Sequence, residues 1–241
     1  VASADTDGEG DFALVRLLYA TDRQATGSRR ASEYFGSDRG PFSYGEAEVT
    51  IPRSHKPGNI EAPSLLKFQW KENPALHIVL MSVDPIHEDK FFAEIGTSLD
   101  TPGTDEVFLF IHGYNATFAA AAKRTAQMVY DLNYAGTPVF YSWPSQGAPG
   151  SYMVDAASVQ VSARHLVGFL EHLVARSGAK PIQIVAHSMG NRALTQALEI
   201  YALRHPDATD VFDQIIFAAP DVDSELFAFR RCSARPRLYP W

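Results

Sequence analysis

Through the second half of the chain, short runs of apolar residues alternate with longer segments whose apolar residues recur at helical spacing. The short runs predict strands and the periodic segments predict helices. The predicted strands are Val107–Ile111, Pro138–Trp143, Ile182–Ala186 and Gln214–Ala218, and the helices between them are Thr117–Tyr134, Tyr152–Arg176 and Asn191–Leu203. Short strands that are apolar on both faces are typical of a mostly parallel sheet with helices on both faces. We therefore predict an α/β fold.

Two of the predicted helices are followed by a glycine. Gly136 and Gly178 stand where a left-handed C-terminal residue usually ends a helix. The helix over Thr117–Tyr134 is expected to turn one apolar face towards the sheet, formed by Phe118, Ala122, Thr125, Val129 and Leu132.

The first half of the chain is less regular. Residues 1–11 are acidic, small and Gly-rich, which is typical of a frayed terminus. Phe12–Ala20 and Ala75–Val83 are apolar enough for buried strands. Residues 23–63 are rich in Gly, Pro, Ser and charge, with one alternating segment, Glu46–Ile51, that suits an edge strand.

We expect a single domain over residues 12–229, because single hydrophobic cores typically stop growing only beyond about 250 residues. Asp100–Asp105 predicts a turn within it. Residues 230–241 lack an apolar period and are expected to form an atypical tail.

Composition narrows the functional classes. The 241 residues include 21 Lys and Arg against 28 Asp and Glu, a formal net charge of −7, without a dense basic stripe, so no nucleic-acid partner is expected. The single cysteine, Cys232, excludes an internal disulfide, and no Cys/His cluster has zinc-ligand spacing. No apolar run approaches the roughly 18 residues of a membrane span. Because phosphate-loop and dinucleotide motifs are also missing, we expect neither a metal nor a cofactor.

Two properties stay open at this stage. The N-terminal residues carry no basic and apolar leader pattern, which fits either a cytoplasmic protein or one exported after removal of a leader. The oligomeric state is not indicated by any pattern in the chain.

The strongest chemical signal is a serine directly after a buried strand. Ile182–Ala186 runs into His187, Ser188, Met189 and Gly190, and a helix follows. This context is typical of a nucleophile elbow, in which small residues two positions before and after the serine permit a tight strand-to-helix turn. Here these small residues are Ala186 and Gly190. The alternative is a serine that only caps the helix.

A second motif stands at the end of another predicted strand. After Phe110 and Ile111 come His112, Gly113, Tyr114 and Asn115. In many hydrolases such a turn presents a backbone N–H to the oxyanion, and the residue after the nucleophile supplies the second N–H. These donors would be Tyr114 and Met189, with Gly113 allowing close approach. A plain turn with Asn115 as helix N-cap is compatible with this role.

A third motif supplies an acid. Asp221 and Asp223 follow the strand after the nucleophile's helix, where a carboxylate can orient a catalytic histidine. The alternatives are a helix cap or a solvated loop.

Three residues at other strand ends, Tyr114, Trp143 and Ser145, could bound a substrate pocket or belong to the core.

Together these motifs resemble a family of bacterial α/β-hydrolases known as a domain of unknown function, and the wider esterase and lipase superfamily. The resemblance covers roughly residues 12–227 and rests on Tyr19-Ala20-Thr21-Asp22-Arg23, Ile51-Pro52 with His55, Gly58 and Glu61, FIHGYN at 110–115, YSWPSQG at 141–147, AHSMGNR at 186–192 and AAPDVD at 218–223. It implies an α/β-hydrolase fold and a serine hydrolase of carboxylic esters. Ser188 would be the nucleophile, and one of the two aspartates the acid.

The positions of the histidines depart from the superfamily pattern, in which the catalytic histidine follows the acid in the chain. The eight histidines are at positions 55, 77, 87, 112, 165, 172, 187 and 205, so none follows Asp223. We therefore expect a C-terminally truncated hydrolase fold. Possible bases are His55, in the irregular region, and His112 and His187, which flank the expected site. Structural roles are expected for all three unless one reaches Ser188.

The motifs and the resemblance predict a serine carboxylesterase that forms an acyl-enzyme at Ser188. Because no long apolar lid segment is evident, we expect short-chain esters as its substrates. One alternative is a non-catalytic or catalytically crippled hydrolase-fold protein. Another is an acyltransferase or amidase with the same nucleophile.

Overall fold

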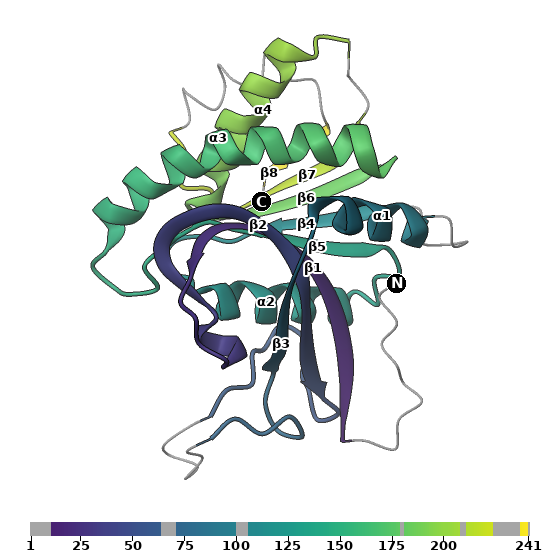
Figure 1. Cartoon of the computed structure of the whole chain (residues 1–241), viewed down its shortest axis with the longest axis vertical. Helices are drawn as coiled ribbons and strands as arrows, with labels where there is room; N and C mark the ends of the chain where they lie inside the picture. Colours follow the sequence, from purple (N-terminus) through teal and green to yellow (C-terminus); the bar gives the residue numbers. More distant parts are fainter. Residues whose placement is uncertain are drawn as a thin grey trace.

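The computed structural model describes residues 11–63, 71–99, 106–178, 181–207, 211–223 and 237–240. Over these residues one eight-stranded sheet has the order β3-β2-β1-β5-β4-β6-β7-β8 (Figure 1). The strands are β1 (Phe12–Ala25), β2 (Phe35–Pro52), β3 (Val79–Ile86), β4 (Val107–Ile111), β5 (Thr137–Ser142), β6 (Ile182–His187), β7 (Phe212–Ala218) and β8 (Arg237–Pro240). The helices are the short 3-10 helix η1 (Ala31–Glu33), α1 (Glu88–Leu99), α2 (Phe118–Asp131), α3 (Tyr152–Ser177) and α4 (Gly190–Arg204).

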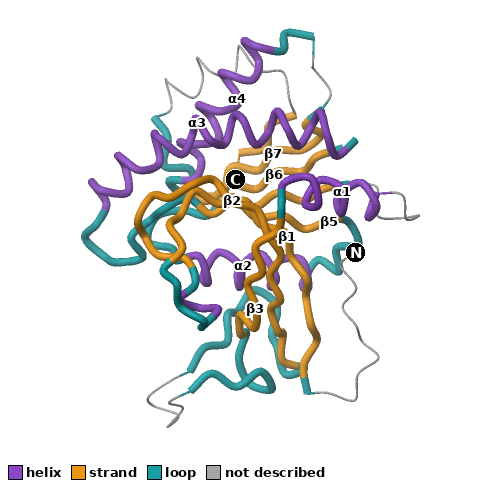
Figure 2. Tube along the Cα trace, viewed as in Figure 1, coloured by secondary structure: helices purple, strands orange, loops and turns teal. Residues whose placement is uncertain are grey.

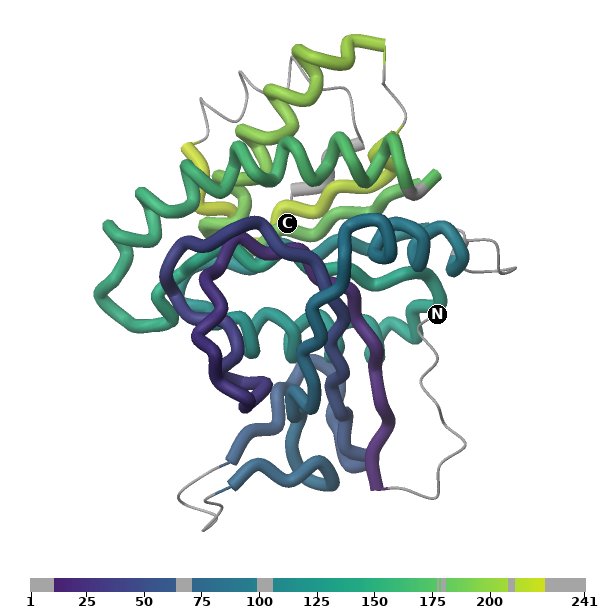
Figure 3. The backbone as a smooth tube through the Cα atoms, in the orientation of Figure 1, coloured from purple at the N-terminus to yellow at the C-terminus, as the bar shows by residue number. Residues whose placement is uncertain are grey.

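The sheet has a parallel and an antiparallel part. Strands β1, β5, β4, β6, β7 and β8 run parallel to one another, which confirms the α/β prediction. Strands β1 and β2 form a long antiparallel hairpin whose register shifts after Thr21 and again after Arg23, and β3 pairs with the outer side of β2. The hairpin can be followed as the curled purple and blue part of the tube in Figure 3.

Helices cover both faces of the sheet (Figure 2). Along β4 the side chains alternate between two cores, as the period of a strand requires. Leu109 and Ile111 join the core beneath α1, α3 and α4, while Phe108 and Phe110 join the core beneath α2. The parallel strands are thus buried on both faces, which explains their continuous apolar runs. Within the described ranges, no helix combines the length and the apolar character needed to cross a membrane.

The first half of the chain is more regular than predicted. Glu46–Ile51 is the end of an 18-residue strand, β2, which lies between β1 and β3 and is therefore not an edge strand. Helix α1 was not predicted, although Phe91, Phe92 and Ile95 form its buried side. The turn expected at Asp100–Asp105 lies outside the described residues. In the C-terminal segment, β8 pairs with β7.

The termini of α2 also differ from the prediction. Its N-cap is Thr117, whose hydroxyl accepts a hydrogen bond from the Ala120 N–H, and not Asn115. It ends at Asp131, and the left-handed residue that follows is Asn133, not Gly136. Leu132 is consequently exposed. At the end of α3, Gly178 has φ +66°, which confirms its predicted role.

Candidate active site

Ser188 lies in the turn between β6 and α4, at the carboxyl edge of the parallel strands. Its φ of +49° is in the left-handed region, which costs a non-glycine residue about 1–3 kcal/mol. The surroundings impose this conformation. The Ser188 N–H donates to the Ala218 carbonyl at 2.9 Å, and the Ser188 carbonyl accepts from the backbone N–H groups of Asn191 at 3.1 Å and Asp221 at 3.2 Å. The strained turn holds the serine partly exposed beyond the sheet.

Two glycines let neighbouring segments approach this turn. A Cβ atom on Gly190 would lie 2.4 Å from the His112 carbonyl oxygen, and one on Gly113 would lie 2.8 Å from Ser188 Cβ. Both positions therefore require glycine. By contrast, Ala186 is fully buried one residue before the end of β6, so alanine fits where the elbow pattern has its first glycine. The segment after β4 and the serine turn are in direct contact.

Two backbone N–H groups next to Ser188 and Gly113 were predicted to be oxyanion donors. Met189 follows the serine, and Tyr114 follows Gly113 after β4. Within the described parts of the chain, neither N–H has an intramolecular acceptor. They are therefore free to donate to a bound acceptor, and their role as oxyanion donors stays a prediction.

His112 is a buried structural residue. Its Nδ1 lies 2.9 Å from the Gly113 carbonyl, its Nε2 lies 3.2 Å from Ser142 Oγ, and its ring stacks on Trp143 at 5.0 Å between centroids. Burial, together with the positive charge of Arg23, lowers the pKa of His112 to about 3. The ring is neutral at pH 7 and has no contact with Ser188, so it is not placed to act as the base.

Asp221 lies beside the serine turn, but its carboxylate is already engaged. Oδ1 accepts from Arg192 Nη2 and Oδ2 accepts from the Tyr152 hydroxyl, each at 2.9 Å. Arg192 also donates through Nε to the Asp221 carbonyl oxygen at 2.9 Å. The hydrogen bond to Asp221 raises the pKa of Tyr152, which keeps its hydroxyl a donor. Asp223 is exposed two residues further along.

The other two possible bases are placed differently. His55 lies between Glu61 and Asp131, with each ring nitrogen 2.8 Å from a carboxylate oxygen. Because Asp131 ends α2, this site lies about 20 Å along the helix from the Ser188 edge. His187 keeps substantial solvent exposure, but the partial burial of its ring and the nearby Arg124 guanidinium lower its pKa. Among the described residues, no imidazole is hydrogen-bonded to the Ser188 hydroxyl.

Two of the expected pocket residues belong to the core. Trp143 and Ser145 are fully buried, whereas Tyr114 is partly exposed and packs edge-to-face against Tyr152, with 5.5 Å between ring centroids. Arg192 and Tyr152 are the site residues that sequence reasoning missed. Arg192 stood within the AHSMGNR motif, but no local pattern indicates that it contacts a residue 29 positions away.

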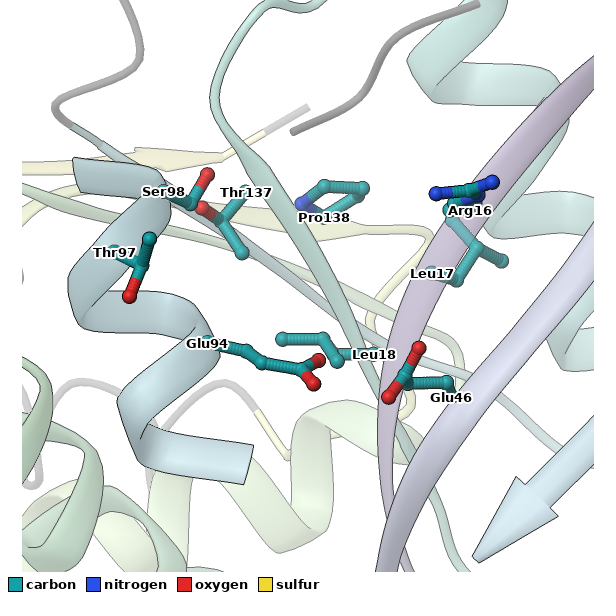
Figure 4. Close-up of a pocket in the computed structure, with 9 residues that line it drawn as sticks. All are labelled: Arg16, Leu17, Leu18, Glu46, Glu94, Thr97, Ser98, Thr137 and Pro138. Carbon is teal, nitrogen blue, oxygen red and sulfur yellow. The ribbon is translucent and has the colours of Figure 1, made fainter. Parts of the chain in front are cut away.

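An open pocket of about 380 Å³ lies away from this site (Figure 4). Thr137 and Pro138 at the start of β5 line it, together with Glu94, Thr97 and Ser98 of α1. It therefore lies at the amino edge of the parallel strands, opposite Ser188.

In the portion of the chain that the structure describes, no group of three or more His, Cys, Asp or Glu residues is arranged to hold a metal ion.

A mostly parallel sheet with helices on both faces, and a strand-to-helix turn of this kind at its carboxyl edge, define an α/β hydrolase. The family model DUF900, described as an alpha/beta hydrolase of unknown function, matches residues 87–235, and the chain belongs to this family. Searches of curated proteins and of solved structures find no match.

Proposed function

We propose that this protein is a serine hydrolase that cleaves carboxylic esters through an acyl-enzyme at Ser188. The observation that carries the proposal is the left-handed backbone of Ser188, held by three backbone hydrogen bonds next to Gly113. Strain at a non-glycine residue persists only where its surroundings impose it, and such residues cluster at functional sites. A serine that only capped α4 would not need this geometry.

The reaction would proceed by acyl transfer. Ser188 Oγ attacks the ester carbonyl carbon, and the tetrahedral oxyanion accepts hydrogen bonds from the N–H groups of Met189 and Tyr114. The proton of the Ser188 hydroxyl passes to the departing alcohol, and water then hydrolyses the acyl-enzyme, releasing the carboxylic acid and restoring the Ser188 hydroxyl. Short acyl esters with good leaving groups are the substrates we expect to be cleaved first.

The reaction requires a general base close to Ser188 Oγ. Of the three histidines considered, His187 is the one whose ring makes no hydrogen bond to a described residue, and its lowered pKa leaves it neutral and able to accept a proton. Without an engaged imidazole, oxyanion stabilisation and binding alone retain roughly 10³–10⁴-fold catalysis over water. We therefore expect slow turnover restricted to activated esters.

One observation favours a second candidate, a hydrolase-fold protein with crippled or no catalysis. Both carboxylate oxygens of Asp221 are occupied by Arg192 and Tyr152, so a histidine could bond this aspartate only by displacing one of them. If Asp221 is the triad acid, Arg192 or Tyr152 must release its carboxylate before catalysis.

A fluorophosphonate probe separates the two candidates, because it labels an activated serine and leaves an idle one unmodified. We expect labelling of wild type and of Ser151→Ala, and none of Ser188→Ala. Ser151 is a matched control because it precedes α3 near the same edge and its side chain makes no capping hydrogen bond. Unlabelled wild type would favour the crippled protein. Product analysis with added alcohols or amines would reveal an acyltransferase or amidase.

A further inference from the structure

Arg23 is a fully buried cation at the carboxyl edge of the sheet. Its guanidinium makes five contacts, to Ser142 Oγ, the carbonyl oxygens of Gly36, Ser145 and Ala116, and His112 Nε2, at 2.7–3.4 Å. A guanidinium has five N–H donors, so each has one acceptor. Such a set of contacts depends on the planar fork of arginine, which lysine cannot reproduce.

None of these acceptors is a carboxylate. Burial lowers the pKa of Arg23 to about 10, although the nearby charges of Asp22 and Asp155 act in the opposite direction. The side chain is therefore still charged at neutral pH. Burying a charge without a paired carboxylate is costly, and its retention at this position points to a role that neutral residues would not fill.

The contacts of Arg23 bracket the segment that carries the candidate oxyanion donor. Nη2 reaches His112 Nε2 at 3.4 Å and the Ala116 carbonyl at 2.7 Å, so the fork touches both ends of the loop 112–116. Gly113 and Tyr114 lie between these two points. The Ala116 N–H donates to Ser145 Oγ at 3.1 Å, and Arg23 also holds the Ser145 carbonyl.

We infer that Arg23 is a positioning residue that fixes the loop 112–116, and with it the Tyr114 N–H, against the Ser188 turn. The inference rests on the proposed function for its kinetic consequence, but its structural consequence does not depend on activity. Arg23 touches no reacting atom. It acts through the backbone of the loop, where a displacement of about 1 Å can cost a hundredfold in rate.

The test compares wild type with Arg23→Met, which removes the donors, and Arg23→Lys, which keeps the charge without the fork. Ser142→Ala is the milder variant if neither folds, because it removes the acceptor of Arg23 Nε. The control is Asp131→Asn, which disrupts a polar cluster at the far end of α2. Two readouts are needed: hydrogen exchange of the peptide covering 112–118, and kcat and KM for p-nitrophenyl acetate.

In Arg23→Met and Arg23→Lys we expect exchange in that peptide to rise at least tenfold while β6 stays protected. We expect kcat to fall about a hundredfold, KM to change less than threefold, and phenylboronic acid, a mimic of the anionic tetrahedral state, to bind more weakly in parallel with kcat. Ser142→Ala should show the same pattern at a few-fold level. Asp131→Asn should leave all of these values unchanged.

Unchanged exchange in folded Arg23 variants would overturn the inference whether or not the protein is an esterase. An increased KM with constant kcat would also overturn it. If wild type shows no turnover but the variants show selectively faster exchange in the loop, the positioning role stands and the proposed function fails.

Discussion

The two edges of the parallel strands are built differently. At the carboxyl edge, three of the four non-glycine residues with left-handed φ among those described, Asn115, Ser188 and Ala219, follow the strands β4, β6 and β7. At the amino edge the open pocket of about 380 Å³ is lined by ordinary strand and helix residues. Backbone strain, and not the presence of a cavity, therefore distinguishes the edge to which we assign chemistry.

The two edges also differ in the partners of their buried polar side chains. The Arg23 guanidinium bonds three carbonyl oxygens, one hydroxyl and an imidazole, so none of its hydrogen-bond partners carries a negative charge. His55 lies between Glu61 and Asp131, and Asp131 also accepts the Gly58 N–H at 2.7 Å. The His55 cluster joins the loop after β2 to α2. One cluster places a loop beside Ser188, while the other only fastens a loop to a helix.

The largest expected effect concerns the acid of the carboxyl edge. If a histidine takes part in turnover, changing the true triad acid to asparagine should lower kcat on the order of a thousandfold. Measured on activated esters, Asp221→Asn and Asp223→Asn should then differ strongly. Small and equal losses would assign both aspartates to structure and support the crippled alternative.

The His55 cluster should make stability pH-dependent. Burial lowers the pKa of His55, but the hydrogen bonds and charges of Glu61 and Asp131 outweigh it and raise the pKa, while the pKa values of both carboxylates are lowered. A raised histidine pKa stabilises the fold below about pH 6.5 and the contribution is lost as pH rises through the folded value. Lowered carboxylate pKa values stabilise it above roughly pH 4.

The free energy of unfolding lost in Asp131→Asn should therefore be largest at about pH 5–6 and smaller at pH 8. Denaturant titrations of both proteins across this range measure it. A difference that grows steadily from pH 6 to pH 8 would show that His55 is neutral in the folded state.

The smallest expected effect is at the amino edge. Thr137 is buried and its Oγ1 has no hydrogen-bond partner among the described residues, so Thr137→Val should stabilise the protein by about 1 kcal/mol. Thr50 is a matched buried threonine whose Oγ1 bonds the N–H and carbonyl of Val79. Thr50→Val should destabilise by a similar amount. The same sign for both changes in thermal unfolding would contradict the assignment of Thr137 Oγ1 as unsatisfied.

The sequence was most informative where the pattern is local. Val107–Ile111 was predicted to the residue, and Ser188, Gly190 and Gly113 were recognised from spacing that only a tight turn and a close approach require. Helix α1 was missed although Phe91, Phe92 and Ile95 carry a usable helical signal. The length of β2 was missed because its first half is rich in Gly and Ser and is organised by pairing with β1.

The remaining parts of the site could not be predicted because they depend on distant partners. Arg23 contacts residues up to 122 positions away, and Asp221 meets Tyr152 across 69 positions. Trp143 and Ser145 stood at a strand end and could face either a pocket or the core. In the folded chain the Trp143 ring stacks on His112, and Ser145 is fully buried. Spacing identifies turns, whereas side-chain clusters of this kind require the fold.

The most direct test of the central claim is to trap the acyl-enzyme. Wild type is mixed with p-nitrophenyl acetate, quenched in acid within the first turnover and digested, and the peptide that contains Ser188 is examined by mass spectrometry. We predict one acetyl group on Ser188, and none on the same peptide from Ser188→Ala. Release of p-nitrophenol with the acetyl group on another residue, or with no acetylated peptide formed, would contradict a nucleophilic role for Ser188.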